Sequence, residues 1–342
     1  MKKRIVAMFL AVCFIVTLLP TAAFAADDAD TSGWATVTVT ESGKLAEAVK
    51  AAYPDTWQTI DKLVVKTADN VELTPDDFQF LSCVVVSETA DGRYSSAYTP
   101  STEGIGLIAL EQLDLTDAKC QEDAIPPRAF QRNTKITTIY LPSTLKRTYI
   151  HAFSMMSSLS HLSVKGGANY TFPQSMEIMG EGMVYEDAAL SGSIDLTALP
   201  NLKGIGGACF YGSGLSGNVT IPAAVDIVKN TDVNKNAEDG YGKSSNIFAK
   251  TNITSLTIQG NPESIGNAFA KNCTQLVSVT LPSSVKTIGK EAFYKTGLTQ
   301  CPNLENVTEI GSSAFSGITS FTNDIVIGEG AKVGKQAFAN SK

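Results

Sequence analysis

The chain has 342 residues, of which 43% are hydrophobic and 18% are charged, and this composition is typical of a folded globular protein. Its formal net charge of -7 and its isoelectric point near 5.0 argue against nucleic acid or an anionic membrane as the main partner, because either would require a basic face.

Residues 1–25 contain the three parts of a secretory signal peptide. A basic start at Lys2–Arg4 precedes an apolar run over Ile5–Leu19, and Ala23–Ala25 forms a small-residue cleavage site. We therefore predict a signal peptide at 1–25 and a secreted or extracellular protein. No later stretch reaches the roughly 18 consecutive apolar residues that span a bilayer, so we expect no membrane insertion of the mature chain.

Residues 26–58 are predicted to form an N-terminal cap. Within them, Thr36–Tyr53 has the pattern of a short strand followed by an amphipathic helix, which would close the open end of a stack of repeats. The stack is expected over 59–342, and Ile60, Leu63 and Val65 form its first predicted strand.

The clearest repeat unit runs from Leu276 to Phe293. Leu276, Val279 and Leu281 have the apolar spacing of a short strand, and Pro282 ends it because proline cannot donate a ladder hydrogen bond. Gly289 is then expected to supply a positive φ for the return turn. A phenylalanine closes each unit and fills its interior, and the same place is held by Phe130, Phe153, Phe210, Phe248, Phe269, Phe293, Phe315 and Phe338.

A single unit of this kind cannot bury its apolar face alone, so neighbouring units must stack. The sequence therefore predicts an α+β solenoid, a curved leucine-rich-repeat array with one parallel β-sheet on the concave face and short helical or irregular return segments. The stretches 165–193 and 223–247 are irregular or carry insertions. The last repeat ends without a capping sequence, which leaves open a truncated C-terminus.

These repeats resemble the BspA-like, or Treponema pallidum type, leucine-rich repeats found in surface proteins of gut and oral bacteria. The resemblance rests on four residue pairs at the family's spacing: Asn272-Cys273, Leu281-Pro282, Ile288-Gly289 and Ala292-Phe293. It implies display on the extracellular surface of a bacterium, adhesion, and binding to a host or bacterial surface protein or glycan, with no chemistry of the repeat's own.

The residues that enzymes and metal sites require are scarce. The chain has two histidines, His151 and His161, which argues against a histidine-centred triad or metal site. We predict no enzyme activity, no catalytic residue, no metal site and no cofactor, and we interpret His151 as a solvated or capped imidazole. A calcium-like loop from Asp232 has Ala237 in place of the required glycine, and Gly242–Ser244 matches only the end of a phosphate-binding loop.

Five cysteines follow the signal peptide, and their spacing matches neither a disulfide framework nor a zinc site. We predict that they are buried and unpaired. The alternative is one disulfide with a reactive cysteine left over.

The outward positions of the predicted strands form the candidate binding face. They carry Lys62 and, as the predicted site residues, Gln112, Asp114, Thr138, Tyr140, His161, Ser163, Asp195, Thr220, Ser255, Thr257, Ser278 and Thr280. Binding and adhesion through this face is the favoured function. The alternatives are a structural spacer or fragment of a larger wall-anchored protein and, less favoured, a hydrolase acting on mucin or cell wall. The ligand, the oligomeric state and the anchoring mode remain open.

Overall fold

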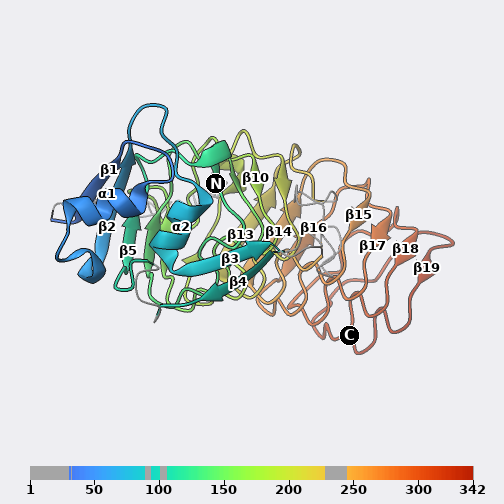
Figure 1. The fold of residues 1–342 in the computed structure, drawn as a ribbon. Coiled ribbons are helices and arrows are strands. Elements are labelled where there is room, and N and C mark those ends of the chain that lie inside the picture. The colour runs from blue at the N-terminus through green and yellow to red at the C-terminus, as the bar shows by residue number, and fades with distance from the viewer. Residues whose placement is uncertain (1–30, 32, 89–93, 101–105, 228–244, 342) are drawn as a thin grey trace, which may run out of the picture.

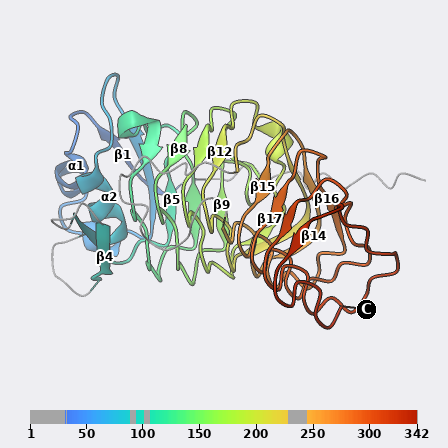
Figure 2. The same ribbon diagram turned by 90° about the vertical axis from the view of Figure 1, so that its right-hand side faces the viewer.

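The computed structural model describes residues 31, 33–88, 94–100, 106–227 and 245–341. The predicted signal peptide, the calcium-like loop and Gly242–Ser244 lie outside these residues. The described chain is a stack of coils, and the stack bends along its length (Figures 1 and 2). The predicted curved solenoid is confirmed.

One side of each coil adds a strand to a parallel sheet, which we call the main sheet and which consists of two runs. The first run has the order β1 (Ala35–Val39), β2 (Lys62–Thr67), β5 (Gln112–Asp114), β7 (Thr138–Tyr140), β9 (His161–Ser163). The second has the order β11 (Ser191–Gly192), β13 (Gly214–Ile221), β14 (Asn252–Ile258), β16 (Ser278–Thr280). Alternate side chains point into the core, as the period of a strand requires.

The return segments are more regular than the sequence predicts. Instead of helical or irregular returns behind a single sheet, they contain a second parallel ladder of two-residue strands. This ladder consists of β6 (Ala124–Ile125), β8 (Arg147–Thr148), β10 (Ile178–Met179) and β12 (Gly204–Ile205), then β15 (Ser264–Ile265), β17 (Thr287–Ile288), β18 (Glu309–Ile310) and β19 (Lys332–Val333). Each repeat forms one coil, and the coils stack with their return segments directly above one another. The backbones of neighbouring return segments therefore also come within hydrogen-bonding distance.

Helices occur mainly at the N-terminal end (Figure 1). There α1 (Leu45–Ala52) buries Leu45 and Val49, and α2 (Pro75–Ser82) begins with a capping box between Thr74 and Asp77. Single turns of 3-10 helix are η1 (Trp57–Thr59), η2 (Gln121–Asp123) and η3 (Leu196–Ala198). An antiparallel hairpin, β3 (Val84–Glu88) with β4 (Tyr94–Tyr98), follows α2.

A column of phenylalanines fills the interior, as predicted, and most of its rings pack on a ring of a neighbouring coil. The ring centroids of Phe293 and Phe315 lie 5.4 Å apart, and those of Phe210 and Phe248 lie 5.6 Å apart. Phe269 is fully buried but stands one residue out of register. Ala270 N donates to Ala292 O in the way that Phe293 N donates to Ala314 O, so Ala270 holds the place predicted for Phe269.

Gly289 in the return segment serves a different purpose from the predicted one. Gly289 does not have a positive φ. A Cβ there would lie 2.5 Å from the carbonyl carbon of Gly266 in the preceding coil, so the position requires glycine because two backbones approach closely. Positive φ falls instead on Glu291 (56°) and Lys295 (52°), on either side of Phe293.

The irregular stretch at 165–193 coincides with the gap between the two runs of the main sheet. The side chain of Asn169 bridges this gap, because its Nδ2 donates to Ser160 O at 2.8 Å and to Ser191 O at 2.7 Å. The same stretch completes a full coil, in which Val184 takes the interior place of a phenylalanine and is fully buried.

Candidate binding face

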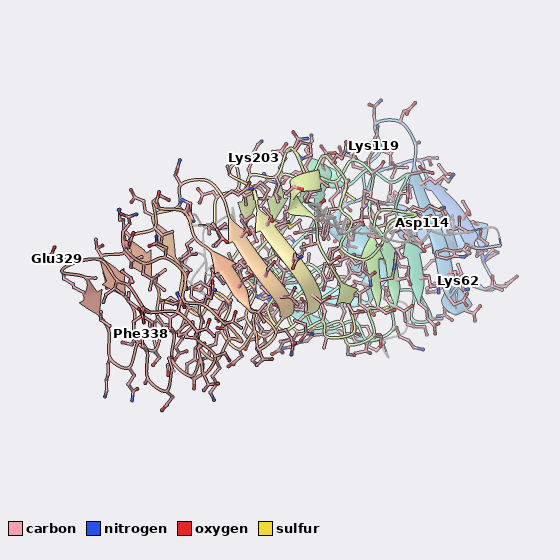
Figure 3. All side chains as sticks on the ribbon, turned by 180° about the vertical axis from the view of Figure 1, so that it is seen from behind. Lys62, Asp114, Lys119, Lys203, Glu329 and Phe338 are labelled. Carbon is pink, nitrogen blue, oxygen red and sulfur yellow. The ribbon has the colours of Figure 1, made fainter. Side chains whose placement is uncertain are left out.

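The predicted binding residues lie on one side of the main sheet and, with one exception, in register. The pairing places them in rows across neighbouring strands: Lys62, Gln112, Thr138 and His161; Asp114, Tyr140 and Ser163; Thr220, Thr257 and Thr280; Ser255 and Ser278. The broad arrows of the main sheet face the viewer in Figure 3, which labels Lys62 and Asp114 on neighbouring strands at the N-terminal end. We call the surface made by these rows the binding face.

Aromatic rings gather on the first run. The Tyr140 ring meets the His161 ring edge-on at 5.4 Å between centroids, and the Trp34 ring stacks on Tyr140 at 6.3 Å. Burial, together with the charge of Asp114, raises the pKa of Tyr140, and burial lowers the pKa of His161. The imidazole is therefore neutral near pH 7, so this part of the face presents uncharged rings.

Asp114 forms buried contacts that hold the first run together. Its side chain is only 2% exposed and forms an ion pair with Lys165, at 3.0 Å between Oδ2 and Nζ. Its Oδ1 accepts a hydrogen bond from Thr116 N at 2.9 Å. A buried carboxylate requires such partners, because losing water without them is costly. Lys165 Nζ also donates to Thr31 Oγ1 at 2.9 Å, which ties the segment before β1 to the chain after β9.

Ser163 is fully buried next to His161, with 2.8 Å between its Oγ and His161 Nε2. The contact has the distance of a nucleophile and its base. However, the Ser163 hydroxyl also lies within donating distance of the carbonyl oxygens of Val164 (2.8 Å) and Gly167 (3.0 Å), beneath the surface. Asp114 and Ser163 therefore belong to the framework below the face, whereas Tyr140 and His161 remain half-exposed.

Asp195 is the exception to the rows. It follows β11 and caps η3, accepting a hydrogen bond from Thr197 N at 2.9 Å. Asn218 on β13 instead completes a row of the second run, since its Oδ1 accepts hydrogen bonds from Ser255 Oγ at 2.8 Å and Thr254 Oγ1 at 3.0 Å.

The second run presents small polar side chains. Thr220, Ser255 and Thr257 are half-buried, and Ser278 and Thr280 on β16 are exposed. Hydroxyl groups of this kind can donate and accept hydrogen bonds across a flat surface, but each contributes little contact area.

Sequence reasoning missed four residues that shape the face: Trp34, Lys165, Asn169 and Asn218. Trp34 directly precedes the first alternating strand, a signal that could have been used. The long-range contacts of Lys165 and Asn169 had no such signal, because both lie in the irregular stretch whose register the repeat pattern does not fix.

His151 and Asp187 are ionisable side chains that are buried away from the face. Of the two alternatives for His151, a solvated or a capped imidazole, the solvated one is wrong: the ring is 8% exposed and packs against Gly182 and Tyr185. Burial, followed by the charge of Arg128, lowers the pKa of His151 to about 4. Asp187 is fully buried with one oxygen accepting from Met156 N, and burial raises its pKa well above the usual value.

All five cysteines that follow the predicted signal peptide are buried and unpaired, which confirms that prediction. Burial raises the pKa of each, for example to about 11 for Cys83, so they stay as thiols. Within the described residues, no cluster of three or more His, Cys, Asp or Glu side chains is arranged to hold a metal ion. None of the described helices is long and apolar enough to cross a membrane.

The repeats match a known family over most of the chain. Residues 98–170, 123–236 and 244–342 match the BspA type leucine rich repeat region, in six copies. The chain belongs to the BspA-type leucine-rich-repeat family. The matched ranges contain every coil from β5 to β19, so the membership covers most of the binding face of this BspA-type protein.

Solved structures with a similar chain course include other leucine-rich-repeat proteins. One from Bacteroides ovatus is 20% identical with a TM-score of 0.48, over 75% of this chain and 67% of that one. The pneumococcal vaccine antigen PcpA is 16% identical with a TM-score of 0.42, over 67% of this chain and 59% of its own. A leucine-rich cell surface protein of Faecalibacterium prausnitzii is 18% identical with a TM-score of 0.34, over 74% and 83%. Curated proteins contain no match to this chain.

Proposed function

We propose that this BspA-type protein is a secreted or surface-displayed bacterial binding protein that holds a protein or glycan partner on the binding face and performs no chemistry. The observation that carries the proposal is the register of the outward side chains. Rows of polar and aromatic groups continue from strand to strand of a rigid sheet, and an extended surface of this kind suits recognition.

The composition of the face sets the expected affinity. Large aromatic anchors, which dominate binding energy in protein interfaces, occur here as Trp34 and Tyr140, while the second run contributes hydroxyl groups. Each contact is therefore weak, and strong attachment follows from several copies acting together.

Two further observations support the absence of chemistry and the location. The contact between Ser163 and His161 is buried on the serine side, so its hydroxyl does not face a substrate. The basic, apolar and small-residue segments of 1–25 have the pattern of an export signal.

A binding array with matched variants tests the proposal. The purified protein, coupled to beads in many copies, is applied to arrays of glycans and extracellular matrix proteins. Thr280→Arg places a large, positively charged side chain on the binding face, and Thr308→Arg places the same side chain at an exposed position beside the second ladder. We expect at least one arrayed partner to lose binding to the Thr280→Arg variant, or to a variant with arginine at another exposed position of the binding face. The same partner should still bind the Thr308→Arg variant.

Two outcomes contradict the proposal. Equal losses with both arginine variants would place binding elsewhere on the molecule. The absence of any signal above background would favour a structural spacer, in which the Ser and Thr rows only maintain the strands and solubility.

A further inference from the structure

A hollow of about 660 Å³ lies at the N-terminal end of the binding face. It is lined by the segment Gly33–Ala35, by Tyr53 and Thr56, and by Thr59–Lys62. Lys62 begins β2 and heads the first row of the face. The size is within the range of about 300–1,000 Å³ that small-molecule sites occupy, and it exceeds what one sugar ring fills.

Both aromatic walls of this hollow are held in place before any ligand arrives. The Tyr53 hydroxyl accepts a hydrogen bond from Thr36 N at 2.8 Å and donates one to Thr36 O at 3.1 Å. Trp34 stacks on Tyr140, and the Lys165 bond to Thr31 holds the chain just before Trp34. Side chains ordered in advance lose little entropy on binding.

The remaining lining is polar. Asp61 is exposed and Lys62 half-exposed, and among the described residues neither side chain has an ion-pair partner. Thr56 and Thr59 lie on the same rim, and the Thr59 hydroxyl donates to Thr56 O at 2.8 Å. The hollow therefore offers aromatic surface on its walls with hydrogen-bond donors and acceptors at its edges.

We infer that this hollow binds a neutral oligosaccharide of two or three units. A sugar ring has an apolar face of C–H groups, which fits against an indole, and a rim of hydroxyls, which Asp61, Lys62 and the threonines hydrogen-bond. An anionic sugar fits less well, because the Asp61 carboxylate and a net charge of -7 oppose it. The inference rests on the proposed function, since it assigns a ligand class to one end of the binding face.

Two titrations test the inference. Isothermal titration calorimetry on the unaltered protein uses lactose, maltotriose and diacetylchitobiose as probes. Fluorescence titration of a Trp57→Phe variant follows Trp34 alone, because the chain has two tryptophans. We expect saturable binding of at least one neutral probe with a change in Trp34 emission.

Variants locate the site. Trp34→Ala should weaken binding by at least about tenfold, as expected for removing an aromatic anchor. Lys62→Met, which keeps the apolar stem, should weaken it by about threefold to tenfold. Tyr140→Ala should weaken binding by altering the position of Trp34, and Tyr140→Phe, which keeps the ring, should weaken it less. Thr308→Ala, at an exposed position away from the binding face, should leave binding unchanged.

Two outcomes would overturn the inference: no saturable binding of any neutral probe, or an unchanged dissociation constant with Trp34→Ala. These outcomes differ from a failure of the proposed function. If an array partner is blocked by Thr280→Arg but no sugar binds in the hollow, the proposed function stands and the inference fails. If a sugar binds at Trp34 but the arrays give no partner, the hollow is a sugar site and the proposed function fails.

Discussion

The two runs of the main sheet share one frame and differ in what they present. In the first run, Tyr140 contacts both His161 and Trp34, the residue just before β1. Asp114 forms an ion pair with Lys165. In the second run, the same positions carry small hydroxyl and amide groups that bond across the strands. The core is alike in both, so the repeat fixes the stack and leaves the outward positions free to specialise.

The largest expected effect tests whether the two runs have equivalent cores. Phe153 under the first run and Phe293 under the second are both fully buried and stacked on a neighbouring ring. Phe153→Ala and Phe293→Ala should each lower the free energy of unfolding by about 3–5 kcal/mol, because each leaves a cavity. Chemical denaturation measures this, and a loss below about 1 kcal/mol at either position would break the equivalence.

The acid dependence of stability should come from the coils under the first run. His151 has its pKa lowered to about 4 from 6.5, so between these values the unfolded state binds the extra proton. The contribution of His151 is therefore complete above pH 6.5 and is lost as the pH falls toward 4, by about 3 kcal/mol. Denaturation of the protein and of His151→Gln over pH 4–7 measures it, and an identical pH profile for the two would contradict the burial.

Asp187 should act in the opposite direction. Burial raises its pKa above 3.8, so the folded state binds the extra proton and stability is lost as the pH rises above that value. Asp187→Asn keeps the acceptor for Met156 N and should be more stable than the unaltered protein at pH 7, by about 1–3 kcal/mol. The difference should vanish near pH 4, and a difference that is constant with pH would show that ionisation plays no part.

The smallest effects separate the outward positions of the two runs. Asp114→Ala removes the partner of Lys165 and of Thr116 N and should cost about 1–3 kcal/mol. Thr280→Ala, on the exposed part of the second run, should stay within about 0.5 kcal/mol. Thermal melting of the two variants side by side measures the contrast, and equal shifts would refute the distinction between framework and free positions.

The sequence predicts the strands, the phenylalanine column and the row positions well, because each coil must bury the same apolar set. Its errors arise where a contact depends on the neighbouring coil. At Gly289, glycine is required because the backbone of the preceding coil lies too close for a Cβ. Ala270 occupies the interior position predicted for Phe269, as its hydrogen bond to the next coil shows. The burial of Asp114 and Ser163 likewise follows from Lys165 and the segment 164–167, which the repeat pattern does not position.

The proposed docking surface is the outward side of the main sheet. Hydrogen–deuterium exchange of the protein with and without a partner found on the arrays tests it most directly. We predict added protection in β5, β7 and β9 or in β13, β14 and β16, with exchange unchanged in β15, β17 and β18. Protection confined to the second ladder, with the main sheet unaffected, would contradict docking on the main sheet.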